Sequence, residues 1–158
     1  METIYNYATL PKKRLAASAL VLNEYGHILI VKPTYRPDWL LPGGAVEDLE
    51  SPREACLREV REELGIEIAL QRLLCVEYLS EELPQTECVQ FVFYGGQFNT
   101  EQMQAITLPD DELSEYRFVT LEEAMLLLSR KLARRLPYCV QALYEQTAWY
   151  VEDGQKAC

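Results

Sequence analysis

Three glutamates crowd into one short stretch of the chain, LREVREELGI, at positions 57–66. Glu59, Glu62 and Glu63 would repel one another on a helix, by roughly 0.2–0.5 kcal/mol for an i,i+4 pair. The net charge of the whole chain is already −10. Carboxylate oxygens at this spacing suit Mg²⁺ or Mn²⁺, which bridge such groups to substrate phosphates. The alternative is a solvated acidic face, neutralised by ion pairs with the neighbouring arginines.

The stretch belongs to a predicted helix, Pro52–Leu64, whose two ends carry capping residues. Ser51 is a natural N-cap, proline suits the first helical position, and Glu54 completes a capping box. A glycine stands just past the last residue, where a left-handed conformation commonly ends a helix. Because side chains four positions apart share a helix face, Glu59 and Glu63 lie together, beside the apolar stripe of the same helix.

The residues around the glutamates stand at fixed gaps. Gly44 is followed by five residues and then Glu50, and seven more lead to Arg58. The complete set of fixed positions is Gly44, Glu50, Arg58, Glu59, Val60, Glu62, Glu63, Gly65 and Ile66. This pattern resembles the Nudix box, also called the MutT signature, G-x5-E-x7-R-E-U-x-E-E-x-G-U, in which U is a bulky aliphatic residue. Every fixed position is filled, and the preceding WLLPGG also resembles the family's usual approach to the box.

The resemblance implies a Nudix-type α/β/α sandwich, with a mixed β-sheet between helices. The predicted order of mixed strands and helices along the chain indicates the same α/β class. We expect one domain over residues 1–158, with an N-terminal arm at 1–13 and a frayed tail at 152–158. This length fits a single domain that buries a sizeable core.

Nudix family members hydrolyse the diphosphate linkage of a nucleoside diphosphate derivative, such as a nucleoside triphosphate or a nucleotide sugar. The resemblance therefore implies a metal-dependent diphosphatase in which water attacks phosphorus, with Mg²⁺ or Mn²⁺ as cofactor. Glu59, Glu62 and Glu63 match the family's metal-binding positions. Arg58 matches the arginine that orients these glutamates by ion pairing. Glu50 matches a glutamate that is structural in some members and near the metal in others.

The catalytic base stays open at this point. Glu62 and Glu63 of the box are candidates, as are Asp111, Glu112 and Glu115 of the acidic loop LPDDELSE. Solvation alone explains an acidic loop equally well. We take Glu112 as the catalytic candidate of the loop.

Candidate substrate-binding residues lie in the loop that precedes the box. An aromatic ring there, Tyr35 or Trp39, could stack on a base, and Arg36 could bind a phosphate through two hydrogen bonds. Trp39 is at least as well explained as an anchor of the core. Gly43 and Gly44 would allow a close approach to the backbone.

The remaining elements follow from hydrophobic period and turn residues. We expect a strand at Arg14–Asn23, a turn at Gly26, a strand at His27–Lys32, a loop at Pro33–Gly44, extended segments within 66–80, a polar turn at 82–87, strands at 88–98 and 115–120, a loop at 102–113, and a helical stretch from 122 to 150 capped by Thr120. Breaks in that helical stretch are expected near Ser129 and at Pro137, where the proline has no N–H to donate.

Composition narrows the set of partners. A pI near 4.6 argues against binding to a nucleic-acid polymer. The basic runs at 12–14 and 130–135 are expected to be solvated, and no apolar run approaches the roughly 20 residues of a membrane span. Five widely spaced cysteines favour reduced thiols in a cytoplasmic protein. The expected partner is a small nucleoside diphosphate derivative, and the family resemblance suggests a homodimer.

Two other functions are available to the same fold. A non-catalytic nucleotide-ligand sensor often has box glutamates replaced, whereas all of them are present here. An isomerase of isoprenoid diphosphates would need a further set of histidines, and the chain has only His27. Both considerations favour hydrolysis.

Overall fold

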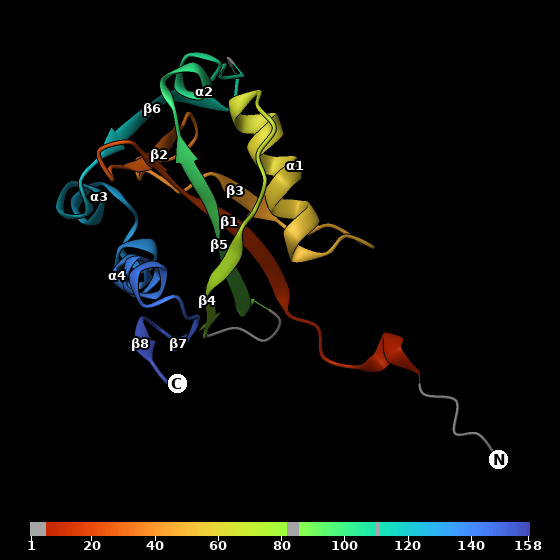
Figure 1. Cartoon of the computed structure of the whole chain (residues 1–158). Helices are drawn as coiled ribbons and strands as arrows, with labels where there is room; N and C mark the ends of the chain where they lie inside the picture. The colour runs from red at the N-terminus through yellow and green to blue at the C-terminus, as the bar shows by residue number, and fades with distance from the viewer. Residues whose placement is uncertain (1–5, 82–85, 110) are drawn as a thin grey trace.

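A mixed β-sheet runs through the middle of the molecule (Figure 1). The structure is a computed structural model that describes residues 6–81, 86–109 and 111–158. Within these residues the strands are β1 (Arg14–Asn23), β2 (Ile28–Pro33), β3 (Gly43–Ala45), β4 (Arg72–Leu79), β5 (Cys88–Phe98), β6 (Leu113–Val119), β7 (Trp149–Glu152) and β8 (Gln155–Lys156). The strand order is β6-β2-β1-β5-β4-β7-β8, with β3 paired to β1. The β1–β5 and β4–β7 pairs are parallel and the others antiparallel.

Helices cover both faces of this sheet. In the described ranges they are α1 (Pro52–Leu64), α2 (Thr100–Gln104), α3 (Leu121–Leu127) and α4 (Arg130–Glu145), preceded by a 3-10 turn at Tyr7–Thr9. α1 lies on one face, and α3 and α4 lie on the other (Figure 1). The predicted α/β/α sandwich with a mixed sheet between helices is therefore confirmed.

Strand β1 shows why both faces need a cover. Its sequence is almost entirely apolar, and successive side chains of a strand point to opposite faces. Ala17, Ala19 and Val21 therefore join the core beneath α1, whereas Leu20 joins the core beneath α3 and α4. The same strand pairs with β3, which leads into α1. The centre of the sheet thus supports the segment that carries the box.

Helix α1 begins and ends where the sequence predicts. The Ser51 hydroxyl accepts a hydrogen bond from the N–H of Glu54 at 3.2 Å, and the Glu54 carboxylate accepts one from the N–H of Ser51 at 2.9 Å. At the other end Gly65 has a φ of +68° and closes the helix. These caps pair backbone groups that a helix end leaves unsatisfied. They fix the helix limits, and with them the face that carries Glu59 and Glu63.

Two segments predicted as loops contain regular structure. Within the first, Leu40 bridges to Val31, and β3 begins at Gly43. The second, 102–113, begins inside α2, which starts at Thr100 after β5 and is capped by Asn99. Prolines and glycines interrupt long elements, but they permit single bridges to a neighbouring strand. Of the predicted polar turn at 82–87, residues 82–85 lie outside the described residues.

The predicted helix break near Ser129 is confirmed, but the break predicted at Pro137 is wrong. Helix α4 runs from Arg130 to Glu145 through the proline. The missing N–H costs a helical hydrogen bond. Leu136 and Cys139 on either side of the proline are nevertheless fully buried, and tertiary packing of this face outweighs the low helix propensity.

The predicted frayed tail is also wrong, because the segment forms a hairpin on the sheet. Strand β7 pairs in parallel with β4, and β8 folds back on β7. The Asp153 carboxylate accepts hydrogen bonds from the N–H and the hydroxyl of Ser80, at 3.0 and 2.7 Å. The N–H of Gly154 donates to Glu77 at 2.8 Å. The Asp-Gly dipeptide is the signal that identifies such a turn.

Two further features of the described residues complete the fold. Residues 6–13 are exposed, as an arm outside the sheet would be. No helix in the described part of the chain is both long enough and apolar enough to cross a bilayer.

Candidate active site

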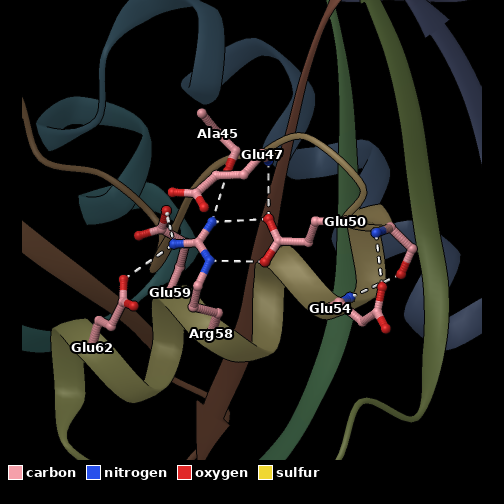
Figure 2. A network of polar contacts seen from close by, with 8 residues as sticks. Ala45, Glu47, Glu50, Glu54, Arg58, Glu59 and Glu62 are labelled. Carbon is pink, nitrogen blue, oxygen red and sulfur yellow. Dashed lines mark hydrogen bonds and ion pairs between the residues drawn. The ribbon is translucent and has the colours of Figure 1, made fainter.

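The guanidinium of Arg58 ties three carboxylates of the box together (Figure 2). It forms a two-pronged ion pair with Glu50, with Nε–Oε1 and Nη2–Oε2 distances of 2.8 and 3.0 Å. Nη1 donates to Glu59 at 2.8 Å and to Glu62 at 3.1 Å, and Nη2 also donates to the carbonyl of Ala45 at 3.0 Å. A planar guanidinium offers five donors in a fixed fork, so it can serve all these acceptors together. Arg58 lies where it would hold the glutamates in fixed orientations.

Glu63 is buried where α1 packs against β3. Only 8% of its surface is exposed, and its Oε2 accepts a hydrogen bond from the N–H of Gly43 at 2.8 Å. Gly43 has a φ of +146°, and a Cβ at this position would lie 2.2 Å from the carbonyl oxygen of Ala17. Glycine is therefore required for the backbone conformation that presents this N–H to the carboxylate.

Glycine at position 44 leaves room for the Glu59 carboxylate. A Cβ there would lie 2.4 Å from Oε1 and 2.5 Å from Cδ of Glu59. The Glu59 carboxylate thus rests directly on the backbone of β3, a contact that only glycine permits. Gly43 and Gly44, which the sequence suggested as substrate contacts, position Glu63 and Glu59.

The clustered carboxylates shift one another's pKa values. Burial raises the pKa of Glu63 to about 8, and the negative charges of Glu59 and Glu112 add to the effect. Burial also raises the pKa of Glu59, whereas the hydrogen bond from Arg58 lowers the pKa of Glu50. Ionisation of such clustered carboxylates is costly without a counter-ion. A bound cation makes their ionised form favourable.

These side chains fit a divalent cation by the chemistry of their donors. Glu59, Glu62 and Glu63 offer hard carboxylate oxygens, which Mg²⁺ and Mn²⁺ prefer. Among residues 6–81, 86–109 and 111–158, no three His, Cys, Asp or Glu side chains lie close enough together to hold an ion in this structure. Arg58 instead holds Glu59 and Glu62. A cation would compete with that guanidinium for the same oxygens.

The acidic loop before β6 comes close to the box glutamates. The N–H of Thr34 donates to the carbonyl of Glu112 at 2.9 Å, which ties the loop to the end of β2. From this position the Glu112 carboxylate acts electrostatically on Glu59 and Glu63. Glu115 is instead engaged in an ion pair with a neighbouring arginine at 2.6 Å. The structure therefore brings Glu112, and not Glu115, toward the box.

An open cleft of about 1050 Å³ adjoins the box, and its lining includes the loop between β3 and α1 and the first turn of α4. Tyr35, Arg36, Gly43 and Gly44, the residues proposed from the sequence as substrate contacts, all line this cleft. Trp39 does not line it: the side chain is only 6% exposed and belongs to the core beneath α3 and α4. The expectation that Trp39 stacks on substrate is wrong, and its alternative role as a core anchor is correct.

Beside the cleft lies a buried ion pair that sequence reasoning missed. Arg135 and Glu77 are buried, with 1% and 0% exposed, and Nε of Arg135 lies 2.5 Å from Oε2 of Glu77. Nη1 of Arg135 donates to Oε1 of Gln90 at 3.0 Å, and both residues line the cleft. The expectation of a solvated basic run at 130–135 is therefore wrong at Arg135. Its i+4 spacing from the buried Cys139 was the available signal.

The chain belongs to the Nudix family. A family model described as the NUDIX domain matches residues 12–141, which include the box, the acidic loop and most of α4. The resemblance inferred from the box is therefore confirmed over most of the chain.

Two named relatives share part of the sequence. Over 80 residues the chain is 40% identical to a Bacillus subtilis (strain 168) protein provisionally named 8-oxo-dGTP diphosphatase, covering 51% of each protein. Over 64 residues it is 42% identical to diphosphoinositol polyphosphate phosphohydrolase 2 of Rattus norvegicus, covering 40% of this chain and 36% of that one. The matched stretches thus span about half, or less, of these relatives.

Solved structures share the fold more completely. A MutT protein from Methanosarcina mazei Go1 superimposes with a TM-score of 0.67 at 28% identity, covering 87% of this chain and 99% of that one. A UDP-X diphosphatase superimposes with a TM-score of 0.73 at 21% identity, covering 90% and 68%. At that identity the second similarity concerns the fold alone.

Proposed function

We propose that the protein is a metal-dependent diphosphatase, which cleaves the diphosphate linkage of a nucleoside diphosphate derivative by attack of water at phosphorus. One observation carries the proposal: Glu59 and Glu63 are placed by α1 against the two glycines of β3, beside a cleft of about 1050 Å³. Clefts of this size accommodate small-molecule ligands. Membership of the Nudix family supports the proposal, as do relatives named as a diphosphatase and a phosphohydrolase.

In this proposal Glu59, Glu62 and Glu63 hold Mg²⁺ or Mn²⁺. A bound ion of this kind neutralises diphosphate oxygens and lowers the pKa of a coordinated water. The protein's contribution is to fix the ligands in advance. Arg58 orients Glu59 through a 2.8 Å hydrogen bond, and the N–H of Gly43 orients Glu63 through another.

Glu112 is the base we favour in this reaction. A base must accept the proton of the attacking water at hydrogen-bond distance. The Glu62 carboxylate is engaged in an ion pair with Arg58 at 3.1 Å, and in this proposal it serves as a metal ligand. Glu112 is exposed, acts on Glu59 electrostatically, and takes part in no ion pair within the described residues.

The cleft would take the remainder of the substrate. Arg36 and Tyr35 are exposed at its edge. The guanidinium would bind a phosphate through two hydrogen bonds, and the phenol ring would stack on a planar group. These contacts would orient the diphosphate without taking part in the chemistry.

A cytoplasmic location and a homodimer belong to the same proposal. Cys56, Cys75, Cys88 and Cys139 are buried free thiols and Cys158 is an exposed one, as suits a reducing compartment. The homodimer rests on family resemblance, and measurement of the molecular mass in solution tests it.

A hydrolysis screen tests the proposed function. Purified protein is incubated with nucleoside triphosphates, nucleotide sugars, dinucleoside polyphosphates and diphosphoinositol compounds, in Mg²⁺, in Mn²⁺ and in EDTA. Cleavage should require metal, and Glu59→Gln and Glu63→Gln should lower kcat by about 100-fold or more. Glu122→Gln, on the exposed surface of α3, is the matched control and should keep full activity.

Two outcomes would contradict the proposal. Full activity of Glu63→Gln would remove the metal assignment. Binding of nucleotides without cleavage of any of them in either metal would favour a ligand sensor.

A further inference from the structure

We infer that Gln90 determines substrate specificity, because Arg135 holds its amide so that an N–H is offered to a carbonyl oxygen on the base of the substrate. The inference rests on the proposed nucleotide substrate and deepens it by naming the bases that fit. These are bases with a carbonyl group, such as hypoxanthine and guanine, at the position where adenine carries an amino group.

The orientation of the Gln90 amide is set by its neighbours. Its Oε1 accepts the hydrogen bond from Nη1 of Arg135 at 3.0 Å. A guanidinium has donors and no acceptor, so only the amide oxygen can face it. The amide nitrogen therefore faces away from Arg135. One of its two N–H groups reaches Sγ of Cys88 at 3.4 Å, a weak acceptor. The second has no hydrogen-bond partner among the residues that the structure describes, and we assign it to a ligand.

Arg135 is itself held by an ion pair with Glu77. Its guanidinium lies against the fully buried carboxylate of Glu77, with Nε and Oε2 2.5 Å apart. Glu77 is fixed in turn by the N–H of Gly154, which donates to Oε1 at 2.8 Å. Buried ionic groups of this kind are costly to rearrange, because breaking the pair leaves a charge without a partner. The hairpin β7–β8 thus supports the amide of Gln90 through two intermediate side chains.

The sheet places Gln90 at a suitable distance from the box. Ala16 of β1 pairs with Gln90 of β5 on one side and with Ala45 of β3 on the other. Ala45 supplies the carbonyl that Arg58 binds. Two strand spacings therefore separate Gln90 from the box, about 10 Å. Gly44 of the box and Gln90 line the same cleft. If the diphosphate binds at the box, the nucleoside would extend along this cleft, across β1, to Gln90.

The chemistry of the base then decides the affinity. A carbonyl oxygen accepts the N–H of Gln90, whereas the amino group of adenine places a donor against a donor. Two facing donors lose their hydrogen bonds to water and gain none, which corresponds to roughly a tenfold loss of affinity or more. The site should therefore select 6-oxopurines over 6-aminopurines.

Inosine and adenosine triphosphates make a matched pair for the test, since the purine rings differ in the 6-oxo group with its N1–H against the 6-amino group with an unprotonated N1, and in nothing else. The wild-type protein should show at least about a tenfold higher kcat/KM for the inosine nucleotide. Gln90→Met removes the amide at similar volume and should bring the ratio of the two values close to one. Gln90→Glu leaves an acceptor in place of the donor and should reverse the preference. Gln141→Met, on the exposed surface of α4, should leave the ratio unchanged.

A second variant separates positioning from folding. Arg135→Lys keeps the charge opposite Glu77 but lacks the second arm that reaches Gln90, so the base preference should fall while the kcat for the inosine nucleotide stays within a few-fold. If Arg135→Lys unfolds, the Gln90 variants decide alone. Equal kcat/KM values for both nucleotides in the wild-type protein, with both cleaved, would overturn the inference and leave the proposed function standing. If neither nucleotide is cleaved, the proposed function is challenged, and the ratio of their dissociation constants tests the inference on its own.

Discussion

The Oε2 atom of Glu63 and the backbone N–H of Gly43 share a hydrogen bond of 2.8 Å, which joins the box helix to the strand before it. The carboxylate of Glu63 is buried, and the backbone of Gly43 has a positive φ that favours glycine. The position of the carboxylate and the packing of α1 on β3 therefore depend on each other. A change at either residue should be detectable in folding as well as in activity.

The buried carboxylate predicts an unusual pH dependence of stability. The pKa of Glu63 rises from its ordinary 4.5 to about 8 on folding, chiefly through burial. Between these values the folded protein holds a proton that the unfolded chain has lost. The free energy of unfolding of the metal-free protein should therefore decrease as pH rises from about 4.5 through about 8. Glu59, whose pKa is also raised by burial, acts in the same direction.

Urea unfolding in EDTA at a series of pH values measures this effect. Glu63→Gln should flatten the decrease, because a glutamine does not titrate, and Glu122→Gln should leave it unchanged. Parallel curves for the wild-type protein and Glu63→Gln would show that the decrease has another origin.

Gly44→Ala should separate activity from stability. The added Cβ would meet the end of the flexible Glu59 side chain at 2.4 Å, so the carboxylate can swing aside at little cost to folding. A misplaced ligand should nevertheless lower kcat by about 100-fold. Gly26→Ala is the control: its φ is +76° and no atom lies within 4 Å of the new Cβ. That variant should lose about 1 kcal/mol of stability and keep its activity. Full activity of Gly44→Ala would contradict the role given to this glycine.

Arg58→Lys should be far from conservative. The lysine retains the positive charge but cannot bind both oxygens of Glu50 and reach Glu59 as well. We expect a loss of about 10–100-fold in kcat with a smaller change in KM, measured by steady-state kinetics. Arg61→Lys is matched to it, because Arg61 is exposed and its ion pair with Glu67 measures 3.8 Å. Equal activity of the two variants would show that charge alone suffices at position 58.

Pro137→Ala should stabilise the protein. Alanine restores the N–H that the interior of α4 lacks, and it has the highest helix propensity. The expected gain is about 1 kcal/mol or more in the free energy of unfolding, measured by chemical denaturation. Pro109→Ala, in the loop before β6, should bring no such gain. A loss of stability in Pro137→Ala would indicate that the ring makes packing contacts worth more than the hydrogen bond.

The sequence predicted those parts of the molecule whose causes are local. The capping residues of α1, the apolar run of β1 and the turn at Gly26 act on their immediate neighbours, and the structure places all three as expected. The box glutamates could be placed on one helix face for the same reason.

The parts that were missed depend on contacts between distant segments. Gln90 of β5, Glu77 of β4 and Arg135 of α4 meet only because the sheet and the helix bring them together. Trp39 was ambiguous since an aromatic residue before the box fits either a ligand contact or the core, and only the packed structure distinguishes them. Hydrophobic period cannot identify such partners, although a charged residue on an apolar face marks where one is needed.

The parallel strand pairs have a consequence for how the chain folds. Arg14 pairs with Cys88 and Cys75 pairs with Trp149, so the middle of the sheet joins residues that are far apart in the sequence. A topology dominated by such long-range pairings has a high contact order, and closing the long loops slows the search for the native state. During synthesis, β1 and β4 can pair at once with their antiparallel neighbours β2 and β5, but their parallel partners β5 and β7 leave the ribosome later. The strand that supports the box is thus held in a completed sheet only near the end of folding.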